Sequence, residues 1–281
     1  MMIPGIDVSH WQGLIDWSEV RRSGVLFAFI KATEFPDKRT KIHVDVRLKE
    51  NIEGANNNGI LWGAYHFFRT HIDPVIQAQV FCETVGKFLS LPPVLDLEVA
   101  GCKGKKLNQK VLAFLEETEK ISGRRPIIYT SGGFWRPMMM YEKRTDADWA
   151  KEYPLWLAQY TSTWPTPCYP WAGWDFWQYS DKGRLPGIKA AVDLNWFNGS
   201  LLELQEKYSV NNKMEVNNHR TNYSKENASE KQDNGSFRVL DMVGKIREKV
   251  NKTNKNNNEL LTTSEENDEW VRKYFFVNPS R

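Results

Sequence analysis

The chain has 281 residues, of which 41% are hydrophobic, and a formal net charge of +3. This length and apolar content suffice for one large hydrophobic core or two modest ones. The weak net charge, without a block of Lys and Arg, argues against nucleic acid as a partner. No apolar run approaches the length of a membrane span.

The N-terminal residues do not resemble a secretory signal. Residues 1–7 lack a basic segment followed by an apolar one. We therefore expect a protein made in the cytoplasm without a signal peptide. The three cysteines, Cys82, Cys102 and Cys168, are odd in number and lack metal-ligand spacing, so we expect reduced thiols in small core positions.

Residues 1–208 alternate apolar runs with helical stretches, the pattern of a parallel α/β architecture. Eight runs are predicted as strands: Gly5–Ser9, Leu26–Ala32, Leu61–Phe67, Val94–Val99, Ile127–Thr130, Leu155–Gln159, Phe176–Tyr179 and Val192–Leu194. Five stretches are predicted as helices: Asp16–Arg22, Val44–Asn57, Pro74–Phe88, Asn108–Ile121 and Phe134–Tyr141. The last three strands are separated by segments rich in Pro, Gly and Trp, without a helical pattern.

Eight strands with about five helices predict a closed but incomplete TIM-like (β/α) barrel. The alternative is an open doubly wound sheet, but no Gly-rich phosphate loop follows the first strand.

The composition changes near residue 208. Eleven of the twelve tryptophans precede Tyr208, whereas the remaining segment is rich in Asn, Lys, Glu and Ser. Such a segment buries too little apolar surface to offset the entropy of ordering. We predict a catalytic domain over 1–208 and a low-complexity tail over 209–281. Apolar residues at helical spacing predict one helix in the tail, over 236–250.

Two carboxylates, Asp96 and Glu98, interrupt an otherwise apolar strand. Residues two apart on a strand share a face, with their Cβ atoms about 6.5 to 7 Å apart. Burial of two acids is costly unless they are paired or used. Paired carboxylates at this reach are what glycosidic bond cleavage requires, and the spacing allows both retaining and inverting outcomes. Solvation, salt bridges and a divalent metal are the alternatives.

Every predicted strand ends in a polar or aromatic residue, and in such barrels the active site lies at the carboxyl ends of the strands. These residues are Asp7, Lys31, Glu34, Tyr65, His66, Asp96, Glu98, Tyr129, Gln159, Trp177, Gln178 and Asp193. Four of these acids, Asp7, Asp96, Glu98 and Asp193, are predicted to lie close together in one pocket.

Like charges in such a pocket raise at least one pKa, which supplies the protonated acid that a glycosidase needs. The other acids, when ionised, stabilise positive charge at the anomeric carbon. The same acids could hold Ca²⁺ or Mg²⁺, but a Ca²⁺ site usually draws its ligands from one flexible loop. We expect no cofactor and no metal.

Aromatic rings at the groove predict a sugar polymer as substrate, because their flat apolar faces match the C–H faces of pyranoses. The tryptophans considered for this role are Trp62, Trp171, Trp174, Trp177 and Trp196.

Seven segments, in order, resemble motifs of the glycoside hydrolase family 25 muramidases. They are residues 5–17, 29–34, 63–68, 93–98, 156–160, 177–180 and 192–195. The first contains Gly-Ile-Asp-Val-Ser-His-Trp-Gln-Gly, and the fourth contains the acid pair. The resemblance covers nearly all of residues 3–200. One departure is Phe35, which stands where the family often has Gly.

The resemblance implies an N-acetylmuramidase that hydrolyses the β-1,4 bond between N-acetylmuramic acid and N-acetylglucosamine in peptidoglycan. It implies Glu98 as general acid and Asp96 as nucleophile or as the group that orients the 2-acetamido of the sugar. Asp7 and Asp193 would adjust this pair and contact the substrate.

The remaining predicted substrate contacts are Tyr65, Tyr129 and Trp177, which would line the −1 region, together with Gln159 and Glu34.

Two other functions are weighed against this one: a chitinase-like hexosaminidase and a catalytically dead sugar-binding barrel. The tail shows no choline-binding repeats or SH3-like strands, so wall targeting by the tail is not predicted. We expect a monomer that reaches the cell wall after release from the cytoplasm, either as a phage endolysin does or as a bacterial enzyme exported by a prophage-like route would.

Overall fold

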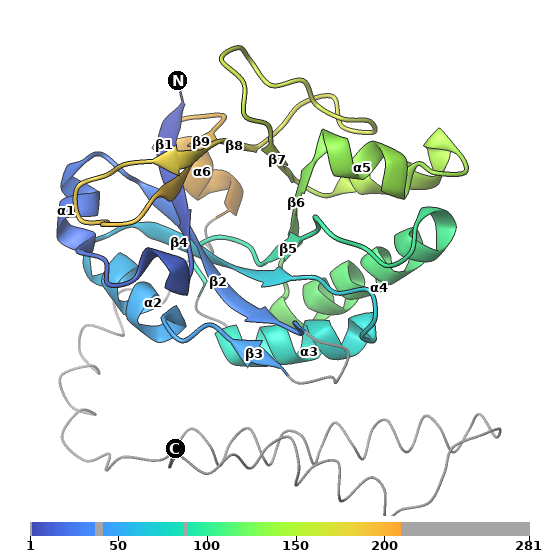
Figure 1. Ribbon diagram of the computed structural model, residues 1–281, viewed down its shortest axis with the longest axis horizontal. Coiled ribbons are helices and arrows are strands. Elements are labelled where there is room, and N and C mark those ends of the chain that lie inside the picture. Colours follow the sequence, from blue (N-terminus) through green and yellow to red (C-terminus); the bar gives the residue numbers. More distant parts are fainter. Residues whose placement is uncertain (1, 37–41, 87–88, 209–281) are drawn as a thin grey trace, which may run out of the picture. The chain divides into compact units, whose positions relative to one another are not determined.

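Eight strands close into a barrel (Figure 1). The structure is a computed structural model that describes residues 2–36, 42–86 and 89–208. Within these residues, the strands of the barrel are β1 (Ile3–Val8), β2 (Phe27–Glu34), β4 (Leu61–Phe67), β5 (Val94–Asp96), β6 (Ile127–Ser131), β7 (Leu155–Ala158), β8 (Phe176–Gly183) and β9 (Val192–Phe197). The ring closes because β1 pairs with both β2 and β9. All eight predicted strands are present, and the predicted incomplete barrel is confirmed.

The five predicted helices are also present, with shifted ends. They are α1 (Trp17–Arg22), α2 (Leu48–Asn57), α3 (Pro74–Val85), α4 (Gly104–Ser122) and α5 (Gly132–Met139). The second begins later than predicted because His43–Val44 forms a short strand, β3, antiparallel to β2. Three further helices were not predicted: the 3-10 helices η1 (His10–Gln12) and η2 (Arg144–Glu152), and α6 (Leu201–Tyr208).

The barrel is not fully parallel, which corrects the predicted parallel architecture. β9 runs antiparallel to both of its neighbours, β8 and β1. A helix is not needed to connect β8 to β9, because antiparallel strands can be joined by a direct turn. The reversal brings the beginning of β9 to the barrel end where the other seven strands finish. We call this end the mouth of the barrel.

Local sequence signals explain where the helices begin. The Asp16 side chain caps α1 by accepting hydrogen bonds from the backbone N–H groups of Ser18 and Glu19. Asp73 caps α3 in the same way, and Pro74 occupies the first helical turn, where its missing N–H costs nothing.

The barrel interior below the mouth is filled mainly by aromatic rings. Phe27, Phe29, Phe176 and Trp156 belong to one buried cluster, in which the Phe29 and Trp156 rings stack with centroids 4.4 Å apart. A second apolar layer, on the outward faces of the strands, packs against helices α1 to α5. Period-two alternation therefore divides each strand between an inner and an outer core.

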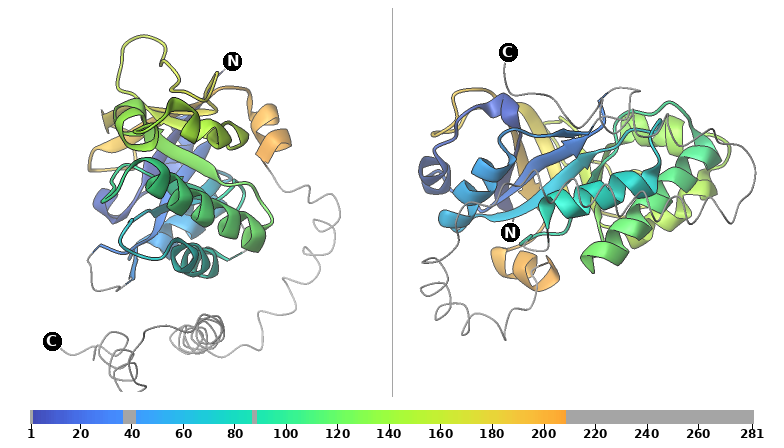
Figure 2. Two further views of the ribbon diagram at one scale, coloured as in Figure 1. Left: turned by 90° about the vertical axis from the view of Figure 1, so that its right-hand side faces the viewer. Right: turned by 90° about the horizontal axis from the view of Figure 1, so that it is seen from below.

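The α6 helix closes the far end of the barrel. Its Leu204 and Tyr208 side chains are buried and join the interior aromatic cluster. The Arg124 guanidinium donates hydrogen bonds to the carbonyls of Leu89 and Leu91 and also to that of Tyr208. Figure 2 shows α6 standing apart from the layer formed by α3 to α5.

The predicted tail over 209–281 and its helix over 236–250 lie outside the described residues, so the domain division stays a prediction. Among the described residues, no helix combines the length and apolarity that crossing a membrane requires.

We predict that Gly5→Ala destabilises the barrel. A Cβ at Gly5 would lie 2.3 Å from the ring of Phe27. That ring is fully buried and confined by Phe29 and Phe176, with centroids 5.9 and 5.3 Å away. Overpacking of this kind lowers the free energy of unfolding by about 1–3 kcal/mol, which urea denaturation measures.

Gly173→Ala is the matched control, because nothing lies within 4 Å of a Cβ at Gly173 and its φ is not positive. Equal stability of the two variants would contradict the packing described for the interior.

Candidate active site

Four carboxyl groups gather at the mouth of the barrel, as predicted. Asp7 lies late in β1 and Asp96 is the last residue of β5, while Glu98 lies just beyond that strand. Asp193 is near the start of β9, directly opposite Asp7 in the strand register. Asp193 was predicted at the carboxyl end of a parallel strand, and it reaches the mouth because β9 is reversed.

The acid pair divides into one buried member and one exposed member. Asp96 is 6% exposed, and its buried Oδ1 has no hydrogen-bond partner among the residues that the structure describes. Burial and the nearby Glu98 raise the pKa of Asp96 well above its ordinary value. Glu98 is exposed to solvent and lies beyond the end of β5. The sequence analysis placed both acids inside the strand, so the exposure of Glu98 is a correction.

The pKa of Glu98 is also raised, chiefly by the protein atoms that crowd it. Because its surface remains accessible to water, solvent moderates this effect. Lys31 and Arg69 lower the pKa of Glu98, while Asp193 raises it. Glu98 therefore combines access to solvent with a protonated fraction above that of a free glutamate.

Asp7 and Asp193 form a second carboxyl pair. Burial and the neighbouring Asp193 raise the pKa of Asp7 well above its ordinary value. Burial also raises the pKa of Asp193, while a hydrogen bond with Asp7 lowers it. These effects make Asp7 the member that holds the proton and Asp193 the acceptor.

A network of amide side chains holds Asp7 in place. Its Oδ2 accepts hydrogen bonds from Gln178 Nε2 at 2.9 Å and from Asn195 Nδ2 at 2.7 Å. Asn195 Oδ1 in turn accepts from Trp156 Nε1 at 2.8 Å. Asn195 was missed by the sequence analysis, and Gln178 was not among the predicted substrate contacts. Strand alternation could have indicated both residues. Asn195 lies two positions after Asp193, and Gln178 lies two positions after the inward Phe176, so each shares a strand face with a residue that points into the barrel.

Three tyrosines complete the polar lining. The hydroxyls of Tyr129 and Tyr160 both donate to Gln178 Oε1, each at 2.9 Å. Burial raises the pKa of Tyr65 well above its ordinary value, and Asp7 and Asp96 raise it further. Tyr65 and Tyr129 are thus brought to the acids, while Tyr160 was not predicted.

The neighbouring positive charge comes from a buried ion-pair triad. Glu34 Oε2 lies 2.6 Å from Lys31 Nζ, and Glu34 Oε1 lies 2.5 Å from Arg69 Nη2. Burial opposes ionisation of Glu34, but hydrogen bonds from the two cations lower its pKa overall. Lys31 and Glu34 are three residues apart, and on a regular strand they would point to opposite faces. A bulge between Lys31 and Thr33 changes the alternation and lets the two side chains meet.

Comparison with known proteins identifies the family of this chain. The family model of glycosyl hydrolases family 25 matches residues 6–188. Lysozyme M1 of Streptomyces globisporus is 36% identical over 217 residues, 72% of this chain and 70% of that protein. The Escherichia coli (strain K12) protein YegX is 40% identical over 213 residues, 72% of each chain. A solved bacterial lysozyme from Streptomyces coelicolor matches with a TM-score of 0.64 and 35% identity, covering 72% of this chain and 95% of its own.

The chain belongs to glycoside hydrolase family 25. The predicted family and enzyme class are therefore confirmed: the protein is a glycoside hydrolase.

Two predicted substrate contacts of this family 25 hydrolase do not face the acids. The Gln159 side chain accepts a hydrogen bond from the Thr166 backbone N–H at 3.0 Å, which supports the β7–β8 segment. Trp177 alternates with the inward Phe176 and Gln178, so it lies on the outer face of β8. Its Nε1 donates to the Gln159 carbonyl at 2.7 Å.

The tryptophans considered for sugar binding are buried or half-buried. Trp62 is an example, being 2% exposed with its Nε1 bonded to Asn56. Among the residues that the structure describes, the exposed indoles are Trp11 and Trp164, at 75% and 67%. Trp164 lies near Trp174 and Trp177, with ring centroids 6.3 and 6.4 Å away. Exposure within a loop depends on tertiary contacts, which composition does not report.

His66 is a core residue of the hydrolase. Its ring nitrogens lie 2.8 Å from Thr33 Oγ1 and 3.0 Å from Gln77 Oε1, and burial lowers its pKa to about 4. It points away from the acids, into the layer between the barrel and helices α3 and α4, where its ring stacks on Phe114 of α4.

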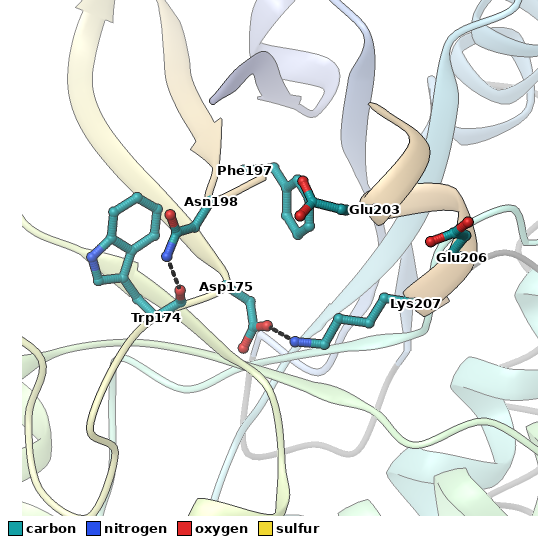
Figure 3. Close-up of a pocket in the computed structure, with 7 residues that line it drawn as sticks. All are labelled: Trp174, Asp175, Phe197, Asn198, Glu203, Glu206 and Lys207. Atoms are coloured by element: carbon teal, nitrogen blue, oxygen red, sulfur yellow. Dashed lines mark hydrogen bonds and ion pairs between the residues drawn. The ribbon is translucent and has the colours of Figure 1, made fainter. Parts of the chain in front are cut away.

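A hollow of about 540 Å³ lies at the far end of the barrel from the mouth (Figure 3). Its lining comes from three places. Trp174 and Asp175 lie just before β8, Phe197 and Asn198 lie at the end of β9, and Glu203, Glu206 and Lys207 belong to α6. Asp175 is ion-paired with Lys207 and accepts from the Tyr208 hydroxyl at 2.7 Å. The negative charge of Asp175 is thus balanced by Lys207, and both contacts fix α6. Asp175 differs in this respect from the buried acids of the mouth, whose pKa values are raised.

We predict that Asp96→Asn makes the folded hydrolase more stable at neutral pH. The pKa of Asp96 is raised on folding, so the unfolded chain loses its proton at a lower pH than the folded one. The free energy of unfolding of the wild type therefore falls as pH rises from about 3.9 towards the folded pKa. Asn does not titrate, so the variant lacks this loss, which urea denaturation at several pH values detects.

Asp16→Asn is the control of opposite sign. The hydrogen bonds that Asp16 accepts at the α1 N-terminus lower its pKa, so its contribution is present at neutral pH and lost in acid. Asn retains capping ability, and this variant should be slightly less stable at pH 7. An Asp96→Asn protein that is also destabilised at pH 7 would contradict the strain assigned to Asp96.

Proposed function

We propose that this family 25 hydrolase is a muramidase, which hydrolyses the β-1,4 bond between N-acetylmuramic acid and N-acetylglucosamine in bacterial peptidoglycan. The observation that carries the proposal is the difference between the two acids of the pair. Asp96 is buried, and its Oδ1 has no hydrogen-bond partner within the described part of the chain, whereas Glu98 is open to solvent. The lysozyme names of its relatives support the substrate.

Glu98 is suited to the role of general acid. It is the member of the pair that a leaving oxygen above the mouth can reach, and its raised pKa favours the protonated form. The Lys31 and Arg69 charges limit that rise, so that the proton can still be given up. After transfer, the same two cations stabilise the glutamate anion.

Asp96 is suited to meet the positive charge that develops at the anomeric carbon. Its anion is poorly stabilised in the free enzyme, because it is buried among other acids. A sugar that becomes cationic supplies the missing counter-charge only as the transition state forms, which is where an interaction increases the rate. Asp96 acts either as nucleophile or as the group that orients the 2-acetamido.

The other mouth residues hold this arrangement and contact the sugar. Asp7 is fixed by Gln178 and Asn195, and its pairing with Asp193 keeps one further proton in the site. Tyr65 and Tyr129 present phenol groups beside the acids, and these stay protonated because their pKa values are raised, chiefly by burial. Protonated phenols can donate hydrogen bonds to sugar hydroxyls.

Aromatic rings next to the mouth supply a surface for a glycan. Tyr160 is 55% exposed and is tied to Gln178 through its hydroxyl, while Trp164 lies further along the same β7–β8 segment. Indole and phenol faces pack well against the C–H faces of pyranoses. A strand of several sugars could therefore extend from the acids over this segment.

Glu98→Gln should lower the rate of reducing-end release from peptidoglycan by about 10²- to 10⁴-fold, since Gln keeps the shape but has no proton to transfer. Colorimetric measurement of reducing ends, with mass spectrometry of the products, checks both rate and bond. The matched control is Glu116→Gln, an exposed residue of α4, which should retain the wild-type rate.

The alternatives give different outcomes in the same assay. Comparable turnover of chitin would favour the hexosaminidase, and binding without turnover by the wild type would favour the sugar-binding barrel. A Glu98→Gln variant with an intact rate would contradict the assigned proton donor.

The cellular role remains part of the proposal. The substrate lies outside the cytoplasmic membrane, which supports action on the wall after release. We further propose that the hydrolase acts as a monomer, since every residue assigned a role at the mouth comes from one chain.

A further inference from the structure

Two imidazoles and one carboxylate converge beside the mouth of the barrel. One potential ligand atom from each of His10, His43 and Asp45 lies within 4.8 Å of the other two. Within residues 2–36, 42–86 and 89–208, no other group of three His, Cys, Asp or Glu residues converges in this way. The four catalytic carboxyls are not members of this group, so the two clusters are distinct.

Asp45 is already held in position for a ligand. Its side chain is fully buried, and its Oδ1 accepts a hydrogen bond from the Arg47 backbone N–H at 2.9 Å. Its Oδ2 accepts from the His10 backbone N–H at 3.0 Å and lies 2.8 Å from His10 Nδ1. Among the described residues, its one ion-pair partner is His10, so this buried anion has no permanent positive charge beside it.

The two histidines are placed by different strands. His10 begins η1 directly after β1, and its ring centroid lies 6.0 Å from that of His43. His43 is fixed in β3 by its pairing with Glu34 of β2. Both imidazoles are half-buried, which leaves one side of the cluster open to water.

The donor set selects the class of ion. Two imidazole nitrogens and one carboxylate oxygen are ligands typical of Zn²⁺, whereas Ca²⁺ and Mg²⁺ prefer oxygen alone. Bonds of about 2.0–2.2 Å in a tetrahedral site bring donors to about 3.4 Å from one another. The separations here are all within 4.8 Å, so the donors would have to approach one another by at most about 1.4 Å to hold one ion.

We propose that His10, His43 and Asp45 bind one Zn²⁺ or a similar divalent transition metal, with a fourth position open to water. Ligation through His10 Nδ1 requires that nitrogen to be free of a proton, so its 2.8 Å contact with Asp45 Oδ2 would be replaced by the metal. The ion would join η1 to β3 and so stabilise the folded state relative to the unfolded chain. This proposal does not depend on the proposed function.

The test uses the full chain, stripped of metal with a chelator and titrated with ZnCl₂ by isothermal calorimetry. We expect one saturable site per chain and a melting temperature that rises with zinc. His43→Ala should weaken zinc binding at least about tenfold and abolish the stabilisation. This variant leaves the bonds between Asp45 and His10 intact, and circular dichroism checks its fold.

His71→Ala, which changes an exposed histidine outside the cluster, is the matched control and should bind zinc like the wild type. Absence of saturable zinc binding by the wild type would overturn the proposal, whatever the behaviour of the variants. Unchanged affinity in His43→Ala would overturn it too, by locating the zinc at other histidines or at the cysteines.

Discussion

The aromatic packing of the barrel interior determines the environment of the carboxyl groups at the mouth. Phe27, Phe29, Phe176 and Trp156 fill the space below the mouth, so an inward carboxyl has no water beneath it and must find donors or keep its proton. Asp7 finds donors in Gln178 and Asn195. Among the described residues, Asp96 Oδ1 has no donor. Burial raises the pKa of both carboxyls well above the ordinary value. Asp96 is the one that lies beside Glu98, and a positive charge that forms on a bound sugar relieves the strain on its anion.

The positive charge near the acids is itself restrained. Lys31 and Arg69 lower the pKa of Glu98, yet both are bound to Glu34 at 2.6 and 2.5 Å. Free cations at the same positions would pull the proton from Glu98 more strongly. The triad exists because a bulge in β2 turns Lys31 and Glu34 to the same side. A local backbone irregularity thus contributes to the proton affinity of a residue on another strand.

Alternation made much of the site predictable. Apolar runs located all eight strands, and period two placed Asp7, Tyr65, Asp96 and Tyr129 at one end of one barrel. Tertiary pairing decided the rest. Nothing in residues 192–197 marks β9 as antiparallel, since direction depends on its neighbours, and the bulge in β2 appears only in the pairing with β4. Glu98 was predicted inside a strand that in fact stops at Asp96. The exposure of Trp11 and Trp164, against the burial of Trp62, follows from loop packing rather than from residue type.

The central claim is that Glu98 delivers the proton while Asp96 meets the developing positive charge. The most direct test compares peptidoglycan with an activated aryl glycoside, such as a dinitrophenyl glycoside of a wall-derived sugar, whose leaving group needs no proton. The account predicts that Glu98→Gln releases dinitrophenolate in the first turnover within about tenfold of the wild-type rate, although it fails on peptidoglycan. Asp96→Asn should be slow on both substrates. Equal loss of rate on both substrates by Glu98→Gln would contradict the account.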